Sequence, residues 1–214
     1  MIIAVDGPTA SGKGTIARAL AAHFGLPHLD TGLLYRAVGH AVARAGGNPD
    51  DPADALAATG FSDDLLADPA LRSEATGALA SRVSVHPDVR AALLERQRAF
   101  ATQPGGAVLD GRDIATVIAP DADAKLFVTA SVAARALRRY LEMRGRGDAA
   151  SREDIAADLA ARDARDSQRS IAPLRQADGA ALLDTSALPI AAAIAAAIAL
   201  VERQVGQNTP NRHG

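Results

Sequence analysis

The spacing of apolar residues along the chain changes repeatedly, and this predicts strands that alternate with helices. Short aliphatic or β-branched runs that lead into turns predict buried strands at residues 2–6, 29–30, 107–110, 125–128 and 181–184. Apolar residues at helical spacing predict helices at residues 14–24, 34–45, 88–100, 131–142, 151–167 and from 189 onward. Strands that alternate with helices of this length are typical of βαβ units. The predicted fold class is therefore α/β, a central parallel sheet flanked by helices.

Local signals support the helix ends and mark one insert. Ser131 can cap one helix, Ser151 with Asp154 can cap the next, and Pro189 opens the last. Residues 48–74 are rich in Asp, Pro and Gly, which predicts an acidic insert made of short helices.

Length and composition narrow the class of protein. A chain of 214 residues is long enough for one substantial core, so we expect a single domain over residues 1–204 and a disordered tail over 205–214. A net charge of −2 does not favour a nucleic-acid or membrane partner. The absence of cysteine excludes disulfides and thiolate metal sites and suits a cytoplasmic protein. The longest apolar run, residues 187–201, is short for a membrane span and predicts a buried helix of a soluble protein.

A phosphate-binding pattern, G-x-x-x-x-G-K, lies between the first strand and the first helix. Its glycines let backbone N–H groups turn inward toward phosphate oxygens, and the helix N-terminus adds partial positive charge. Lys13 would reach the β- and γ-phosphates of ATP, and Thr15 would help to organise the Mg²⁺ of MgATP. An ordinary Gly-rich turn is the alternative, but Lys13 is the sole lysine of the first 124 residues. The predicted ATP-binding residues are Gly7, Pro8, Thr9, Ala10, Ser11, Gly12, Lys13, Gly14 and Thr15.

Four polar clusters accompany the predicted strand ends and helices: Asp30 to Arg36, Ser81 with Arg90, Asp110 to Asp113, and Arg162 to Arg169. Open α/β sheets bind ligands at the carboxyl ends of their strands, and arginines there suit anionic groups. Taken singly, each cluster also fits a bland alternative, namely a helix cap, a solvated helix face or a β-turn with a local ion pair. The N-K-x-D and D-x-x-G elements of guanine-reading GTPases are absent from the sequence.

Together these motifs resemble the bacterial cytidylate kinases, a family of nucleoside monophosphate kinases. The matching stretches are residues 7–15, 30–36, 80–100, 110–131 and 162–174, in register over residues 1–204. The resemblance implies an adenylate-kinase-like P-loop fold, with an acceptor-binding region at about residues 31–100 and a mobile lid at about residues 139–152. It also implies a monomer that transfers the γ-phosphoryl of MgATP to CMP or dCMP, giving ADP and CDP or dCDP. The insert at 48–74 is shorter than in fuller family members.

The resemblance also assigns roles to residues. It implies that CMP is bound by Asp30, Thr31, Tyr35, Arg36, Ser81, Arg90, Arg112, Asp113, Arg162, Asp166 and Arg169. It places the catalytic charges on Lys13, Arg112, Arg139, Arg144 and Arg162. Two alternatives stay open: a different small-molecule kinase of the same fold, such as a shikimate-type enzyme or another monophosphate kinase, and a catalytically silent nucleotide-binding regulator.

Overall fold

The structure is a computed structural model that describes residues 1–145 and 150–208. The chain divides into two compact units, which we call the core unit (Met1–Leu29 with Ala101–Gly214) and the helical unit (Asp30–Phe100). Part of the expected lid, residues 146–149, lies outside the described residues, as do residues 209–214 of the expected tail. Each unit is treated by itself below.

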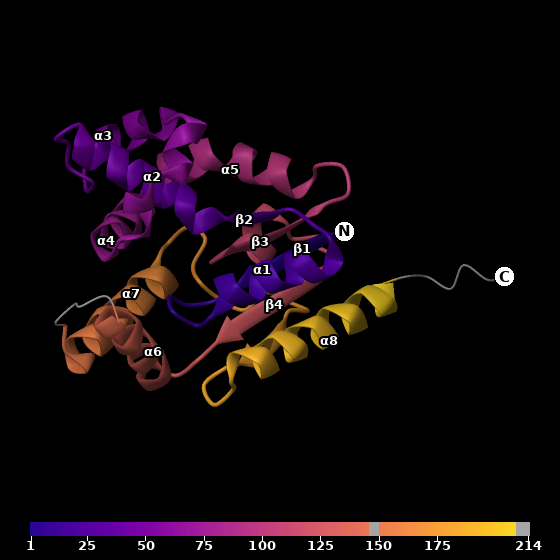
Figure 1. Ribbon diagram of the computed structural model, residues 1–214. Coiled ribbons are helices and arrows are strands. Elements are labelled where there is room, and N and C mark those ends of the chain that lie inside the picture. Colours follow the sequence, from indigo (N-terminus) through magenta and orange to yellow (C-terminus); the bar gives the residue numbers. More distant parts are fainter. Residues whose placement is uncertain (146–149, 209–214) are drawn as a thin grey trace. The chain divides into compact units, whose positions relative to one another are not determined.

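The elements follow one another as the sequence predicts, with some additions (Figure 1). The core unit contains β1 (Ile2–Asp6), α1 (Lys13–Phe24), β2 (His28–Asp30, ending at the unit boundary), β3 (Ala107–Gly111), the π-helical turn η4 (Ile114–Ile118), β4 (Ala124–Thr129), α6 (Val132–Gly145), α7 (Arg152–Gln168), β5 (Ala181–Asp184) and α8 (Ile190–Asn208). The helical unit contains α2 (Thr31–Arg44), α3 (Pro52–Ala57), the 3₁₀ turns η1 (Ala58–Gly60), η2 (Asp63–Ala67) and η3 (Pro69–Arg72), α4 (Glu74–Val83) and α5 (Pro87–Ala101).

A five-stranded sheet with the order β2-β3-β1-β4-β5 forms the centre of the core unit. The central strand β1 pairs in parallel with β3 and β4, and β4 pairs in parallel with β5. Ile3, Val5 and Leu126 are fully buried in this sheet, and Ile16 and Leu20 of α1 pack on it. The predicted α/β fold is confirmed. The apolar runs of the inner strands β1 and β3 are buried as predicted, whereas the edge strands β2 and β5 are only partly buried, with Leu182 of β5 56% exposed.

The last helix, α8, differs from its prediction as a buried helix. Only one face is buried, through Ala193, Ala197 and Val201, and this face packs with α1 and β4, whereas Ile190 is 63% exposed. By length and composition alone residues 190–207 could cross a membrane, which for a single helix is weak evidence, and 17% of that window is buried. The high alanine content explains why an apolar helix is buried on one face only. Alanine raises the mean hydropathy of the segment, yet exposing its small side chain to water costs little free energy.

The helix α8 also extends beyond the predicted start of the tail at residue 205. Val205 packs against the core cluster, so the apolar face continues for one more turn and α8 ends at Asn208. The tail prediction is therefore wrong for residues 205–208.

The helical unit confirms the predicted insert of short helices and adds one that was not predicted. Ser73 begins the added helix, α4, by accepting a hydrogen bond from the backbone N–H of Thr76. The helices α2 and α4 pack closely at Gly39, where an added Cβ would lie 2.7 Å from Leu79 Cβ and 2.9 Å from Leu79 C. Backbone of α4 thus occupies the space that a side chain at residue 39 would need.

We expect Gly39→Ala to destabilise the helical unit by about 1–3 kcal/mol, because the new methyl group forces α2 and α4 apart. Gly60→Ala is the matched control in the same unit, since a Cβ at Gly60 meets nothing within 4 Å. Urea unfolding of both variants and the parent measures the difference. Equal stability of the two variants would mean that α2 and α4 separate without cost.

Candidate functional site

The loop between β1 and α1 has the curled backbone that the phosphate-binding pattern predicts. Gly7 lies so close to β4 that an added Cβ would be 2.0 Å from the carbonyl oxygen of Val128. Ala10 has a φ of 61° and Gly12 has a φ of 91°, so two loop residues are in the left-handed region. For Ala10 this costs about 1 kcal/mol, which the surrounding loop must offset. Gly12 is the N-cap of α1, whose first N–H groups have no acceptor within the helix.

A carboxylate and a hydroxyl accompany the start of α1. The carboxylate of Asp110, at the end of β3, has an oxygen 3.6 Å from the position of an added Cβ on Gly14. Its other oxygen lies 2.7 Å from Nε2 of His28 on β2. Thr15 Oγ1 accepts a hydrogen bond from Arg18 at 3.4 Å. No group of three or more His, Cys, Asp or Glu side chains that could hold a metal occurs in residues 1–145 and 150–208.

The last residue of β1, Asp6, links this strand to the segment after β3. Its buried carboxylate accepts hydrogen bonds from the backbone N–H groups of Ile114 and Ala115, at 2.8 and 2.9 Å. Asp6, at the end of β1, therefore caps the first N–H groups of the π-helical turn η4. Burial raises the pKa of Asp6 from 3.8 to about 7. The two hydrogen bonds and Arg112 work against this rise, and the carboxylate of Asp113 adds to it.

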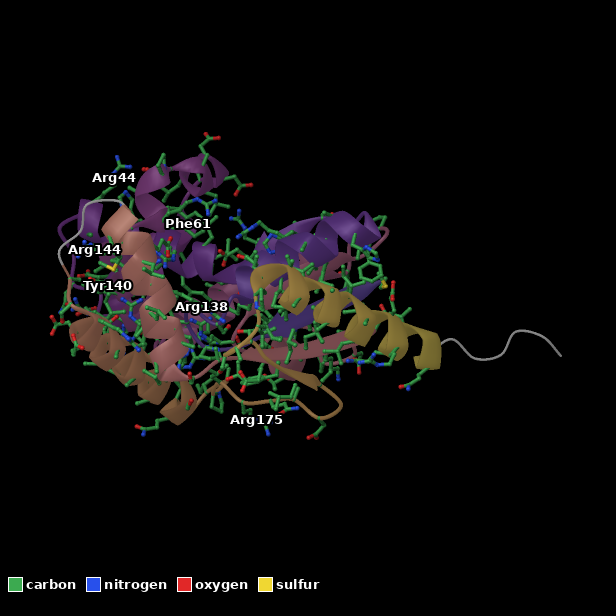
Figure 2. The ribbon with its side chains drawn as sticks, turned by 60° about the horizontal axis from the view of Figure 1, so that its bottom comes forward. Arg44, Phe61, Arg138, Tyr140, Arg144 and Arg175 are labelled. Carbon is green, nitrogen blue, oxygen red and sulfur yellow. The ribbon has the colours of Figure 1, made fainter. Side chains whose placement is uncertain are left out.

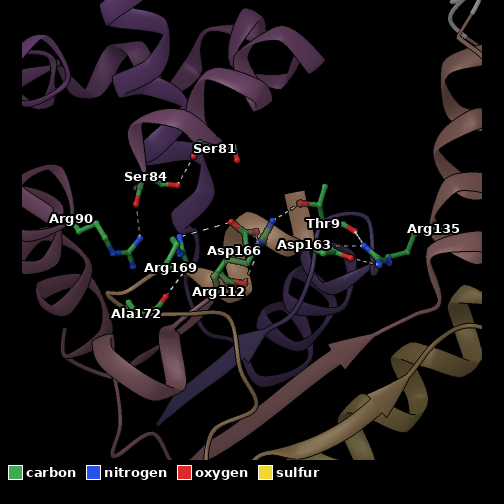
Figure 3. Close-up of polar contacts among 11 residues, drawn as sticks. Thr9, Ser81, Ser84, Arg90, Arg112, Arg135, Asp163, Asp166, Arg169 and Ala172 are labelled. Atoms are coloured by element: carbon green, nitrogen blue, oxygen red, sulfur yellow. Dashed lines mark hydrogen bonds and ion pairs between the residues drawn. The ribbon is translucent and has the colours of Figure 1, made fainter. Parts of the chain in front are cut away.

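The guanidinium of Arg112 joins the phosphate-binding loop to α7 (Figure 3). It donates to Thr9 Oγ1 at 2.6 Å and to Asp166 Oδ2 at 2.7 Å. Arg169 Nη1 lies 3.9 Å from the other oxygen of Asp166. Burial by itself raises the pKa of Asp166, but the charges of Arg112, Arg169 and Lys13 together lower it below its ordinary value. Lys13, Arg112, Asp166 and Arg169 thus form one electrostatic cluster, which we call the cationic cluster.

The charge run at residues 162–169 is only partly a solvated helix face: Arg165 is exposed, whereas other members of the run are buried. Arg162 and Asp166 are each only 7% exposed, and the side chain of Arg169 is equally covered. Arg162 lies 2.9 Å from Asp158 Oδ2, one turn earlier, and Arg169 donates to the carbonyl of Ala172. Buried charges of this kind need partners, and these residues have them.

The arginines of α6 fall into two groups (Figures 2 and 3). Those predicted as catalytic make contacts within the helix, Arg139 with Glu142 and Arg144 with the hydroxyl of Tyr140. Two others, which the sequence did not single out, reach the neighbourhood of the phosphate-binding loop. They are Arg135, which donates to the carbonyl of Thr9 at 3.1 Å and forms a bidentate pair with Asp163, and Arg138, which donates to Thr185. The hydroxyl of Thr185 in turn donates to the carbonyl of Ser11 at 2.9 Å.

In the helical unit, three of the residues predicted for the acceptor lie together. The guanidinium of Arg90 is 5.5 Å from the centre of the Tyr35 ring and donates to the carbonyl of Ser84 at 3.3 Å. The hydroxyl of Ser84 donates to the carbonyl of Ser81 (Figure 3). Arg90 is 9% exposed and Tyr35 equally so, which means that this guanidinium is largely shielded from water.

Arg36, also predicted for the acceptor, is anchored in the helical unit by backbone carbonyls. Its Nη1 donates to the carbonyls of Leu71 and Ser73, both at 2.8 Å, and its guanidinium lies against Gly77. Thr31, at the start of α2, is 3% exposed, and Asp30 precedes it as the N-cap. Arg36 is thus oriented by the turn between η3 and α4.

Comparison with known proteins identifies the family. A sequence profile described as "Cytidylate kinase" matches residues 3–203. The chain belongs to the cytidylate kinase family. A protein of Xanthobacter autotrophicus named cytidylate kinase is 59% identical over 97% of this chain and 100% of that protein. Cytidylate kinases of Rhodopseudomonas palustris and Methylocella silvestris are each 55% identical over 94% of this chain, and the matches cover 96% and 94% of those proteins.

A solved structure shares the fold. The crystal structure of an uncharacterized protein from Eubacterium ventriosum matches 97% of this chain with a TM-score of 0.51 and 14% identity. At this level of identity the similarity concerns the fold alone. The family resemblance inferred from the motifs is therefore confirmed by sequence, and the α/β architecture by structure.

The sequence motifs did not identify several residues that lie around the phosphate-binding loop. Asp6 reads as the end of an apolar strand, and Thr185 as a loop residue after β5. Arg135 had a signal, because it lies one turn before Arg139 on the same predicted helix, and Arg138 directly precedes Arg139. Their contacts with Thr9, Thr185 and Asp163 depend on how α6 and α7 pack, which spacing alone does not give.

The raised pKa of Asp6 predicts a pH-dependent effect of Asp6→Asn on stability. Between pH 4 and 7 the folded parent keeps a proton that the unfolded chain has released, so this site's contribution to stability is lost as pH rises through about 7. Asparagine does not titrate, so its contribution to stability does not fall as pH rises. It does give up one of the two backbone hydrogen bonds that Asp6 accepts. We expect the variant to be less stable than the parent at pH 5. Between pH 5 and pH 8 its free energy of unfolding should rise by about 1–3 kcal/mol relative to that of the parent.

Urea unfolding at both pH values measures this difference, with Asp121→Asn, on an exposed carboxyl of the core unit, as the matched control. A stability difference between Asp6→Asn and the parent that stays constant from pH 5 to 8 would contradict the titration of Asp6.

Proposed function

We propose that this cytidylate kinase family member transfers the γ-phosphoryl of ATP directly to the phosphate of CMP, and also of dCMP. The observation that carries the proposal is the cationic cluster, where Arg112 touches both the phosphate-binding loop and α7. Phosphoryl transfer between two polyanions needs such concentrated positive charge, because negative charge accumulates on the transferring group. Full-length similarity to proteins named cytidylate kinase supports CMP as the acceptor.

ATP would be held by the phosphate-binding loop, residues 7–15. Its backbone N–H groups and the N-terminus of α1 would face the phosphates, and Lys13 would place its charge at the β- and γ-phosphates. Two oxygen groups at the start of α1, the hydroxyl of Thr15 and the carboxylate of Asp110, would suit the Mg²⁺ that arrives with ATP, because Mg²⁺ prefers hard oxygen ligands. When bound, Mg²⁺ would neutralise charge on the β- and γ-phosphates.

The chain's own residues then position the groups and stabilise charge. The CMP phosphate is already ionised at neutral pH, so its oxygen attacks without a general base and no covalent enzyme intermediate forms. Lys13, Arg112 and Arg162 would stabilise the transferring group, with Asp166 and Arg169 setting the arginines around the acceptor phosphate and ribose. Arg139 and Arg144 would join them from the lid, which would exclude water as a competing acceptor.

Recognition of the acceptor would use the residues that the resemblance to the family assigns to it. In the helical unit these are Asp30, Thr31, Tyr35, Arg36, Ser81 and Arg90, with Arg36 directed at the phosphate. Asp113 would accept from the exocyclic amino group of cytosine, and Arg90 would donate to its ring nitrogen. Uracil reverses both edges, so it would leave a carboxylate and a guanidinium mispaired.

We further infer the domain organisation, oligomeric state and cellular location of the enzyme. The helical unit would be the acceptor-binding region and residues 139–152 the lid of one catalytic domain. The resemblance to the family supports a monomer, and the cysteine-free, nearly neutral chain suits a cytoplasmic enzyme of pyrimidine nucleotide metabolism without nucleic-acid or membrane partners.

The test is ADP release from MgATP over a panel of acceptors, namely CMP, dCMP, UMP, AMP, GMP and shikimate. We expect turnover with CMP and dCMP and a loss of about 100-fold or more in kcat for Lys13→Ala, with an unchanged melting temperature. Parent-like turnover by Lys13→Ala would refute the loop assignment. Preference for another acceptor would make the chain a different kinase, and no turnover with any would favour a silent regulator.

The base assignment predicts a change of selectivity in Asp113→Asn. Asparagine keeps the shape but adds a donor, so the carbonyl of uracil would no longer be repelled. We expect CMP activity to fall and the CMP-to-UMP ratio of kcat/KM to drop by at least about tenfold. Both acceptors are measured at fixed MgATP in the parent and the variant. An unchanged ratio would leave Asp113, which is 5% exposed, with a structural role only.

A further inference from the structure

Thr9, in the phosphate-binding loop, receives hydrogen bonds from two arginines of different elements (Figure 3). Arg112, after β3, donates to its side-chain oxygen at 2.6 Å, and Arg135, on α6, donates to its carbonyl at 3.1 Å. A phosphate-binding loop uses its backbone N–H groups for the nucleotide. The side chain and the carbonyl of Thr9 are therefore available for another task.

The two contacts fix different parts of Thr9, one its backbone and one its side chain. Arg135 is 3% exposed and is also fixed by Asp163 and by the carbonyl of Ala130, so it is a rigid anchor for the backbone of Thr9. With the backbone fixed, the hydroxyl is presented to Arg112 in a defined position. On its other side Arg112 meets Asp166.

We propose that the hydroxyl of Thr9 is a positioning residue for Arg112, setting its guanidinium for phosphoryl transfer. A neutral acceptor suits this task because it orients the cation without cancelling its charge, whereas a second carboxylate would compete with phosphate oxygens. Thr9 thus couples the loop that holds the donor nucleotide to an arginine that serves the transferring group. The inference rests on the proposed role of Arg112.

Two substitutions separate the hydroxyl from the shape of the side chain. Thr9→Val keeps the volume and removes the acceptor, whereas Thr9→Ser keeps the acceptor and removes a methyl group. We expect Thr9→Val to lower kcat about tenfold or more, with KM for ATP within about threefold of the parent, since a misplaced charge affects the transition state more than binding. Thr9→Ser should recover most of the lost kcat. Melting temperatures of both variants report any loss of folding.

A double-mutant cycle with Arg112→Ala tests whether the effect acts through the arginine. We expect Thr9→Val to lower kcat by less than about twofold once Arg112 is absent. Three results would overturn the proposal: parent-like kcat in Thr9→Val, equal impairment of Thr9→Ser, or a full tenfold loss in the Arg112→Ala background. If Arg112→Ala itself turned over like the parent, the role of Arg112 in the proposed function would fail as well. Failure of Thr9→Val alone, with Arg112→Ala impaired, would leave that function intact.

Discussion

The parallel pairing of β1 with β3 is the constraint on which the rest of the core unit depends. Its register sets Asp6 opposite Gly111, so the phosphate-binding loop and the segment Asp110–Asp113 leave the sheet at the same edge. The carboxylate of Asp6 then holds the first N–H groups of η4. Without this register, Arg112 could not reach Thr9, and Asp110 would not lie beside the start of α1.

A second constraint is electrostatic. A site for polyanions needs several cations close together, and these repel one another and are costly to bury when no phosphate is bound. In the core unit this cost is offset by carboxylates on α7, where Asp163 pairs with Arg135 and Asp166 with Arg112. The lowered pKa of Asp166 keeps it ionised at neutral pH despite burial. The helix α7 thus supplies the anions that hold cations from α6 and from the segment after β3.

Backbone carbonyls perform a similar task for other arginines. In the helical unit Arg36 donates to Leu71 and Ser73, and in the core unit Arg169 donates to Ala172. Neutral acceptors fix the direction of a guanidinium at a smaller electrostatic cost to ligand binding than a carboxylate. Arginine suits this arrangement because its five donors allow one edge to be anchored while others face a ligand.

The sequence by itself determined the fold class, most element bounds and the family. Buried parallel strands must be continuous apolar runs, and a loop that curls around phosphate must have glycines at fixed spacing, so both leave local signals. The motifs also named Arg112 and Asp166, without indicating that they pair. The helix α4 and the one-sided burial of α8 were missed, because a short capped helix and an alanine-rich surface give weak periodicity.

Only the tertiary structure decided which charged side chains meet. Arg135 and Arg138, which the motifs did not single out, contact Thr9 and Thr185, and Asp6 and Thr9 acquire partners more than one hundred residues away. The spacing of residues on a helix fixes which of them share a face. It does not fix the rotation of that helix against its neighbours, and this rotation, set by core packing, selects the contacts.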